Sequence, residues 1–163
     1  MRVYVPSTLP ALAAAHAAGS IAPAPVTAFA VTPTLREWYT AGDIEELEFT
    51  AMLDAARASL RLLLSEPLAP RRRVVIAVDV PDTLVAPQPH LDRSALHVTS
   101  PITLASWASV HVDAAEAVED VRKAVEAVEL ADRGDIDAGF TVDAADDHAL
   151  LWYATQEVPY LVG

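Results

Sequence analysis

The run Val74-Val75-Ile76-Ala77-Val78-Asp79-Val80 decides how this chain folds. It is almost continuously apolar and rich in β-branched residues, which is typical of a strand buried on both faces of a sheet. Arg71–Arg73 precede the run and Pro81 ends it. We therefore expect a central strand over residues 74–80. The three arginines are interpreted as a solvated lead-in to it, and the alternative is a contact with a bound anion.

The end of this strand belongs to a pattern, Val-x-Val-Pro-x-Thr-Leu, that occurs twice. It reads Val3-Tyr4-Val5-Pro6-Ser7-Thr8-Leu9 near the start and Val78-Asp79-Val80-Pro81-Asp82-Thr83-Leu84 near the middle. A valine-rich run that stops at proline indicates a strand end followed by a turn or a helix start. The repeat predicts one domain over residues 1–163, built from two similar halves, 1–70 and 71–163. Chance recurrence of the common residues Val and Leu is the alternative.

The remaining elements follow from helix caps and apolar spacing. Asp43 and Glu46 have the spacing of a capping box, and Asp113 and Glu116 repeat it. Apolar residues between Phe49 and Leu64 recur at helical spacing, so this helix should organise the core. We expect strands over residues 2–5, 26–31, 74–80, 96–99, 107–112 and 139–142, and helices from 7 or 8 to 18, 34–41, 43–66, 113–133 and 143–158.

This order of elements predicts an α+β fold. We expect a mixed, largely antiparallel sheet of about five strands with helices packed on one face. A ferredoxin-like arrangement is the nearest named candidate.

The composition excludes several classes of protein. The chain has 163 residues, 53% of them apolar, a net charge of −12 and no cysteine. Disulfides, thiolate metal sites and cysteine nucleophiles are therefore excluded. A strongly acidic chain repels nucleic-acid phosphates, so we expect no nucleic-acid partner. No apolar stretch is long enough to span a membrane, so we expect no membrane partner and a cytoplasmic location.

No phosphate-binding loop, nucleophile elbow or zinc-protease motif is present. The best candidates for polar chemistry are histidines and nearby carboxylates, which could form a nitrogen–oxygen metal site or an acid–base pair if they converge. Each also has a structural explanation, as a residue of a sheet face or of the first turn of a helix. We expect neither a metal nor a cofactor, and whether the protein is an enzyme is left open. These polar-site candidates are His97, His111, Asp146, Asp147 and His148.

Two aromatic dipeptides are more distinctive. Trp38-Tyr39 lies in the expected short helix, and Trp152-Tyr153 lies in the expected last helix. Adjacent helical residues point about 100° apart, so one aromatic of each pair can enter the core while the other stays at its edge. Core packing is one role; the other is an exposed patch that binds a partner, with Gln156 and Glu157 as a polar rim.

Three segments resemble parts of a family of uncharacterised actinobacterial conserved proteins. They are Leu35-Arg36-Glu37-Trp38-Tyr39, Asp54-Ala55-Ala56-Arg57-Ala58-Ser59-Leu60-Arg61 and Leu151-Trp152-Tyr153-Ala154-Thr155-Gln156-Glu157. The similarity runs over nearly the whole chain, including its Arg-Val-Tyr-Val-Pro start. The resemblance implies an actinobacterial, intracellular, single-domain protein. It implies no reaction, and it assigns no catalytic residue.

These observations leave two hypotheses for the function. The first is a non-catalytic cytoplasmic module that binds a protein partner or itself, as a homo-oligomer, through Trp38, Tyr39, Trp152, Tyr153 and Glu157. The second is a small-molecule-binding protein or enzyme with a His/Asp polar site between the sheet and the helices.

Overall fold

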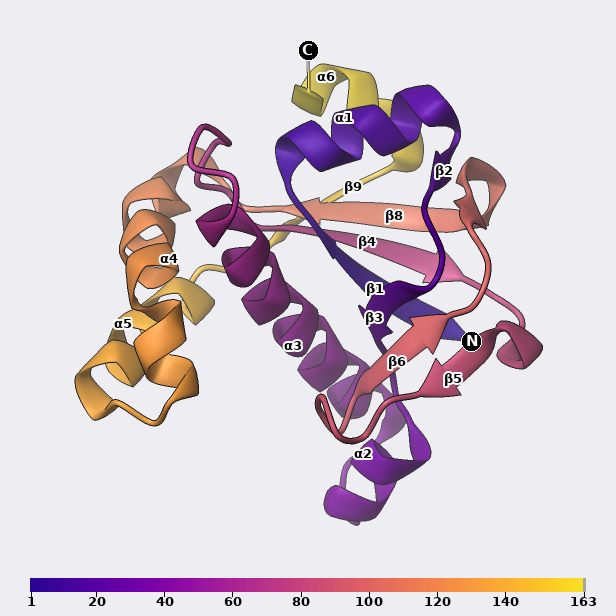
Figure 1. Ribbon diagram of the computed structural model, residues 1–163, viewed down its shortest axis with the longest axis horizontal. Helices are drawn as coiled ribbons and strands as arrows, with labels where there is room; N and C mark the ends of the chain where they lie inside the picture. The colour runs from indigo at the N-terminus through magenta and orange to yellow at the C-terminus, as the bar shows by residue number, and fades with distance from the viewer. Residues whose placement is uncertain (163) are drawn as a thin grey trace.

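The computed structural model describes residues 1–162, and the strand over 74–80 lies at its centre (Figure 1). This strand is β4 (Val74–Asp79), and its side chains are buried from Val74 to Val78. It lies between β1 (Arg2–Ser7) and β8 (Trp107–Val112), and both pairings are antiparallel. The prediction of a central strand buried on both faces is confirmed.

The main sheet has seven strands in the order β5-β6-β3-β1-β4-β8-β9, more than the sequence predicts. Every pairing within it is antiparallel, and β2 and β7 form a separate two-stranded sheet. The α+β class is therefore confirmed. The remaining strands are β2 (Ser20–Ile21), β3 (Val26–Phe29), β5 (Val85–Pro87), β6 (Ala95–Val98), β7 (Ile102–Thr103) and β9 (Leu151–Tyr153).

Helices cover both faces of the sheet, so the expectation of helices on one face is wrong. Along β1, Val3 and Val5 point toward a core that includes residues of α1 and α6, whereas Tyr4 points toward the core under α3. The alternation follows from the two-residue period of a strand. A strand as apolar as β4 needs cover on both faces, because one open face would expose its alternate valines to water. The helices are α1 (Leu9–Ala18), α2 (Pro33–Trp38), α3 (Ile44–Leu64), α4 (Val118–Asp132), α5 (Ile136–Asp146) and α6 (Val158–Val162).

Caps define the ends of the first helices as local chemistry predicts. Thr8 accepts a hydrogen bond from the backbone N–H of Ala11 at the start of α1, and Asp43 accepts one from Glu46 at the start of α3. Gly19 closes α1 with φ = 80°, a left-handed conformation that favours glycine. The two helices pack on opposite faces of β1, α1 with Val3 and Val5 and α3 with Tyr4.

The helices α4 and α5 pack on each other and on the C-terminal half of α3, beyond the end of the sheet (Figure 1). Val121, Val125 and Val128 of α4 are buried in this third core with Leu60 and Leu63 of α3. The valine face therefore packs inside the fold and is not free to contact a second molecule.

The C-terminal quarter differs from the expected secondary structure. Residues 139–142 lie inside α5 and form no strand, and Asp143 lies in the middle of that helix, whose cap is Asp135. The expected helix over 143–158 is interrupted by β9. Short apolar runs fit a helix or a strand equally well, and here the free edge of β8 selects the strand.

The sheet is not ferredoxin-like. That fold is built on a split βαβ unit, in which another strand separates the two strands that flank a helix. Here β3, which follows α1, pairs directly with β1. The two Val-x-Val-Pro stretches also lead into different structures. The first leads into α1, and the second into the 3-10 turn η1 (Asp82–Leu84). A duplication of two halves stays a prediction.

None of the described helices combines the length and the apolar character that crossing a membrane would require.

Candidate functional site

The second Trp-Tyr pair lies on β9, at one edge of the main sheet. Trp152 pairs with His111, which pairs with Val75, and Val75 belongs to the core under α3. The side chain of Trp152 therefore points to the α3 side of the sheet, where 62% of it is exposed. Tyr153 packs into the opposite core. Because the pair lies on a strand, its two rings point to opposite faces of the sheet.

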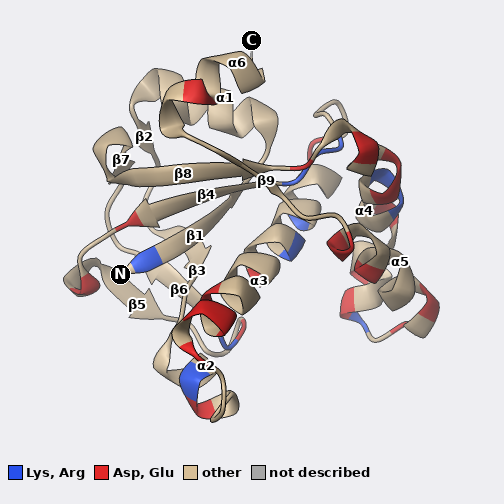
Figure 2. Ribbon diagram, turned by 180° about the vertical axis from the view of Figure 1, so that it is seen from behind, with Lys and Arg blue, Asp and Glu red and all other residues tan. Residues whose placement is uncertain are grey.

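A cavity of about 160 Å³ lies on the same side, between α3 and the segment that joins α5 to β9. Its apolar wall includes Phe49, Met52 and Leu53 of α3, and Leu150, which directly precedes β9. Phe49 is 62% exposed, as is Trp152. Figure 2 shows β9 toward the viewer, with α3, α4 and α5 beside it. We call Phe49, Leu150 and Trp152 the aromatic surface.

Arg73 forms the polar wall of this cavity and is 1% exposed. Its Nε and Nη2 atoms donate to the carboxylate of Asp113 at 2.8 and 2.9 Å, and Nη1 donates to Asp146 at 2.9 Å. Nη2 also donates to the backbone oxygens of Ala145 and His148. One guanidinium group therefore ties the ends of β4 and β8 to the turn that leads into β9.

The sequence interpretation of these residues was wrong. Arg73 is not solvated, and Asp113 is no helix cap, because α4 begins at Val118 without a side-chain cap. The pairing of Val74 with Val112 places Arg73 across from Asp113, and this register is visible only in the structure. An Asp-x-x-Glu spacing alone does not distinguish a cap from a buried ion-pair partner.

The other two arginines of the cluster are also used inside the fold. Arg71 donates to the carbonyl oxygens of Leu63 and Glu66 at the end of α3. Arg72 donates to the carbonyl oxygen of Asp113. Arg71 and Arg72 therefore bond backbone carbonyl oxygens of the fold, and each guanidinium group has a structural role.

The Asp146-Asp147-His148 corner does lie at the cavity, but its side chains have separate partners. Asp146 bonds Arg73, while His148 Nε2 lies 2.7 Å from Asp120. Burial raises the pKa of Asp146, and the Arg73 charge opposes that rise. Asp147 is exposed. The corner therefore consists of two structural pairs and one surface carboxylate.

His97 and His111 do not share a site. They lie on β6 and β8, with β3, β1 and β4 between them, which separates them by about 19 Å. His111 lies 2.9 Å from the hydroxyl of Ser109, and burial, aided by the charge of Arg2, lowers its pKa. Among residues 1–162, no group of three or more His, Asp and Glu side chains could hold a metal ion.

The first Trp-Tyr pair forms a second, separate exposed patch at the end of α2. Trp38 is 60% exposed, and the guanidinium of Arg93 lies 3.5 Å from the centre of its ring. Both ribbon views place α2 well away from β9 (Figures 1 and 2). Tyr39 is also exposed, whereas Glu157 accepts a hydrogen bond from the backbone N–H of Ala154 and stabilises the turn after β9. The two aromatic pairs therefore do not form one continuous surface.

Negative charge is concentrated beside the aromatic surface. Residues 113–147, which include α4 and α5, contain 12 of the 23 Asp and Glu residues and only 3 of the 11 Lys and Arg residues. In Figure 2 the ribbon of both helices is red at many positions, which marks Asp and Glu residues. We call residues 113–147 the acidic lobe. It contributes a net charge of −9 to the total of −12.

We expect Asp54 to make the stability of the protein depend on pH. Its carboxylate accepts a hydrogen bond of 2.6 Å from the buried Ser94, and burial raises its pKa from 3.8 to about 6, although the Ser94 bond opposes the rise. The folded state therefore binds this proton more tightly than the unfolded state. Stability should fall as pH rises from about 4 to about 6, by roughly 2–3 kcal/mol.

The Asp54→Asn variant tests this expectation, because asparagine keeps an acceptor for Ser94 but cannot ionise. Urea unfolding of both proteins at pH 4 and pH 7 should show a smaller loss of stability in the variant. An identical loss in both proteins would assign the pH dependence to other groups.

A search of curated proteins and a search of solved structures each found no match. A family model described as "Family of unknown function (DUF6912)" matches residues 1–162. This match confirms the resemblance to a family of uncharacterised proteins. The chain therefore belongs to this family of unknown function, DUF6912.

Proposed function

We propose that this protein is a non-catalytic binding module for a basic polypeptide segment that presents one large apolar side chain. The segment would place that side chain against the aromatic surface and its positive charges against the acidic lobe. The observation that carries the proposal is the pair of large aromatic residues, Phe49 and Trp152, each 62% exposed on the same side of the sheet.

Exposed aromatic residues of this size are typical anchors of protein interfaces. Tryptophan is enriched among the few residues that supply most of the binding free energy. Trp152 pairs with the half-buried His111 across β8 and β9, so the indole ring projects from a hydrogen-bonded strand. Leu150, two residues before Trp152, packs against the core under α3 and lines the cavity together with Phe49. A rigid support lowers the entropy lost on binding.

Charge favours a basic partner over a second copy of the chain. Two molecules that each carry −12 repel one another, and the acidic lobe brings most of that charge close to the aromatic surface. A basic segment would instead be attracted to the lobe, which raises the rate of encounter.

The engaged polar groups around the cavity support binding rather than catalysis. Arg73 and Asp146 bond each other, and His148 pairs with Asp120. These bonds hold the turn before β9 in place, so each pair has a structural role that requires no substrate.

The change Trp152→Ala should weaken binding of a synthetic lysine–leucine amphipathic helical peptide by about tenfold or more. The substitution alters no charge, so electrostatic attraction to the lobe is kept while the apolar anchor is lost. Isothermal titration calorimetry measures the change. The matched control is Trp38→Ala, which removes a ring of nearly equal exposure, 60%, from the separate patch on α2.

Three outcomes would contradict the proposal. One is equal weakening by Trp152→Ala and Trp38→Ala, which would mean that the peptide has no preferred surface. The second is equal or tighter binding of a glutamate–leucine peptide of the same length. The third is a native mass spectrum of the purified protein that shows a dimer lost in Trp152→Ala, which would make the occupant a second copy.

A further inference from the structure

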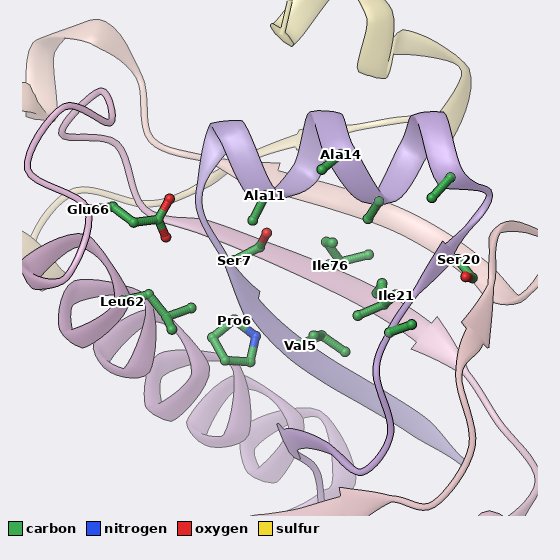
Figure 3. Close-up of a pocket in the computed structure, with 13 residues that line it drawn as sticks. Val5, Pro6, Ser7, Ala11, Ala14, Ser20, Ile21, Leu62, Glu66 and Ile76 are labelled. Atoms are coloured by element: carbon green, nitrogen blue, oxygen red, sulfur yellow. The ribbon is translucent and has the colours of Figure 1, made fainter.

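A second cavity, of about 400 Å³, lies beneath α1 and shares no lining residue with the cavity at the aromatic surface (Figure 3). Val5 and Ile76 of the central strands form its floor, and one face of α1 forms a wall. Figure 3 shows Glu66 at one end of this cleft and Ser20 and Ile21 at the other. The cleft is therefore elongated along α1.

The cleft exists because the sheet is open at this point. β1 pairs with β4 along its whole length from Arg2 to Ser7, but with β3 only at Tyr4 and Phe29. Beyond Tyr4, β1 therefore lacks a strand neighbour on the β3 side. Alanines on α1 leave this space unfilled, because their side chains reach only one carbon from the backbone. The alanines that line the cleft from α1 are Ala11, Ala14, Ala15 and Ala18.

The lining is apolar apart from Ser7, Ser20 and Glu66, and the charge at its end is negative. The Glu66 carboxylate is half-buried and accepts a hydrogen bond from the Thr8 hydroxyl. Its own charge has no ion-pair partner within residues 1–162. The nearby Arg71 guanidinium donates to carbonyl oxygens, including that of Glu66 itself. A cation at this end would complete the ion pair.

We propose that the cleft binds a primary aliphatic amine, with its alkyl chain along α1 and its ammonium group at the Glu66 carboxylate. The wall from Ala11 to Ala18 is about 10 Å long. An extended chain of roughly eight carbons spans that length at ordinary bond lengths. The volume also lies within the range of small-molecule sites. This site is independent of the proposed function, because it uses other residues.

Calorimetric titration with n-octylamine tests the proposal, with n-octanoate and n-octanol as probes of equal length. We expect octylamine to bind at least tenfold more tightly than octanoate, and to bind more tightly than butylamine by roughly threefold to fourfold for each added methylene. Glu66→Gln should weaken octylamine binding about tenfold or more and leave octanol binding unchanged. Glutamine still accepts the Thr8 bond. Glu129→Gln, an exposed change on α4, is the matched control for net charge.

A second pair of variants tests the location. Ala14→Leu should block the cleft and abolish octylamine binding, whereas Ala17→Leu, also exposed on α1 but outside the lining, should not. Equal binding of octylamine and octanoate, no detectable binding of octylamine, or no effect of Ala14→Leu would each overturn the proposal. The comparison of amine with carboxylate uses the unmodified protein, so it holds even if a variant fails to fold. Trp152→Ala should leave octylamine binding intact, which separates this site from the aromatic surface.

Discussion

Arg73→Ala is expected to lower the free energy of unfolding by about 3–5 kcal/mol. Arg73 and its partner Asp113 are 1% and 0% exposed, so the substitution leaves a carboxylate buried without its cation. It also removes the donor to the backbone oxygens of Ala145 and His148. Unsatisfied buried groups keep their full desolvation cost. Urea unfolding followed by circular dichroism measures the difference.

The matched control is Arg2→Ala, which breaks the ion pair of Arg2 with Asp79. That pair joins β4 to its other neighbour, β1, but both side chains are substantially exposed. Its loss should cost no more than about 1 kcal/mol. The double change Arg73→Met with Asp113→Leu should recover part of the stability, because it removes both charges together. Similar losses for Arg73→Ala and Arg2→Ala would contradict the assigned role of the buried pair.

Leu60→Ala is expected to destabilise the protein by about 2–5 kcal/mol. Leu60 is 0% exposed and lies where α3 meets α4 and α5, in one core with Val121 and Val125. Removing its branched end deletes buried apolar surface and leaves a cavity in the core between α3, α4 and α5. The midpoint of thermal unfolding, with calorimetry for the enthalpy, measures this loss.

Leu64→Ala controls for the change of residue type and for helix propensity. Leu64 follows Leu60 by one helical turn on α3 but is 39% exposed. Leu64→Ala should therefore lower the free energy of unfolding clearly less than Leu60→Ala does. If the two variants lost equal stability, the third core would contribute less than its burial indicates.

Both predictions concern the part of the fold that supports the aromatic surface. Arg73 holds the turn before β9, and Leu60 anchors α4 and α5 against α3. Milder variants at these positions are therefore expected to reduce peptide binding through the position of Trp152. Arg73→Lys, which keeps the charge but not the fork of donors, is the sharpest such variant.

The candidate site could be predicted only in part. Trp152 and the Asp146–His148 corner are visible in the sequence as distinctive residues, and both lie at or beside the cavity. Phe49 was interpreted as part of the core stripe of α3, yet it is exposed, because apolar spacing does not say how wide a face the neighbours cover. Glu66 and the alanines of α1, which line the cleft, belong to no sequence motif that would have indicated a site.

The sequence by itself determined the features that depend on neighbouring residues. The apolar run of β4, the Thr8 and Asp43 caps and the αL position of Gly19 follow from interactions over four residues or fewer. Such interactions are the same in any fold that contains the segment.

The tertiary structure alone decided which distant segments meet. Residues 151–153 form a strand because they pair with the edge of β8. Arg73 and Asp113 form a buried ion pair because β4 and β8 pair in a single register. The tertiary structure also left β1 without a β3 partner beyond Tyr4, where the cleft lies beneath α1. These outcomes depend on contacts between residues tens of positions apart, where hydrogen-bond geometry and burial select one partner from many that local sequence allows.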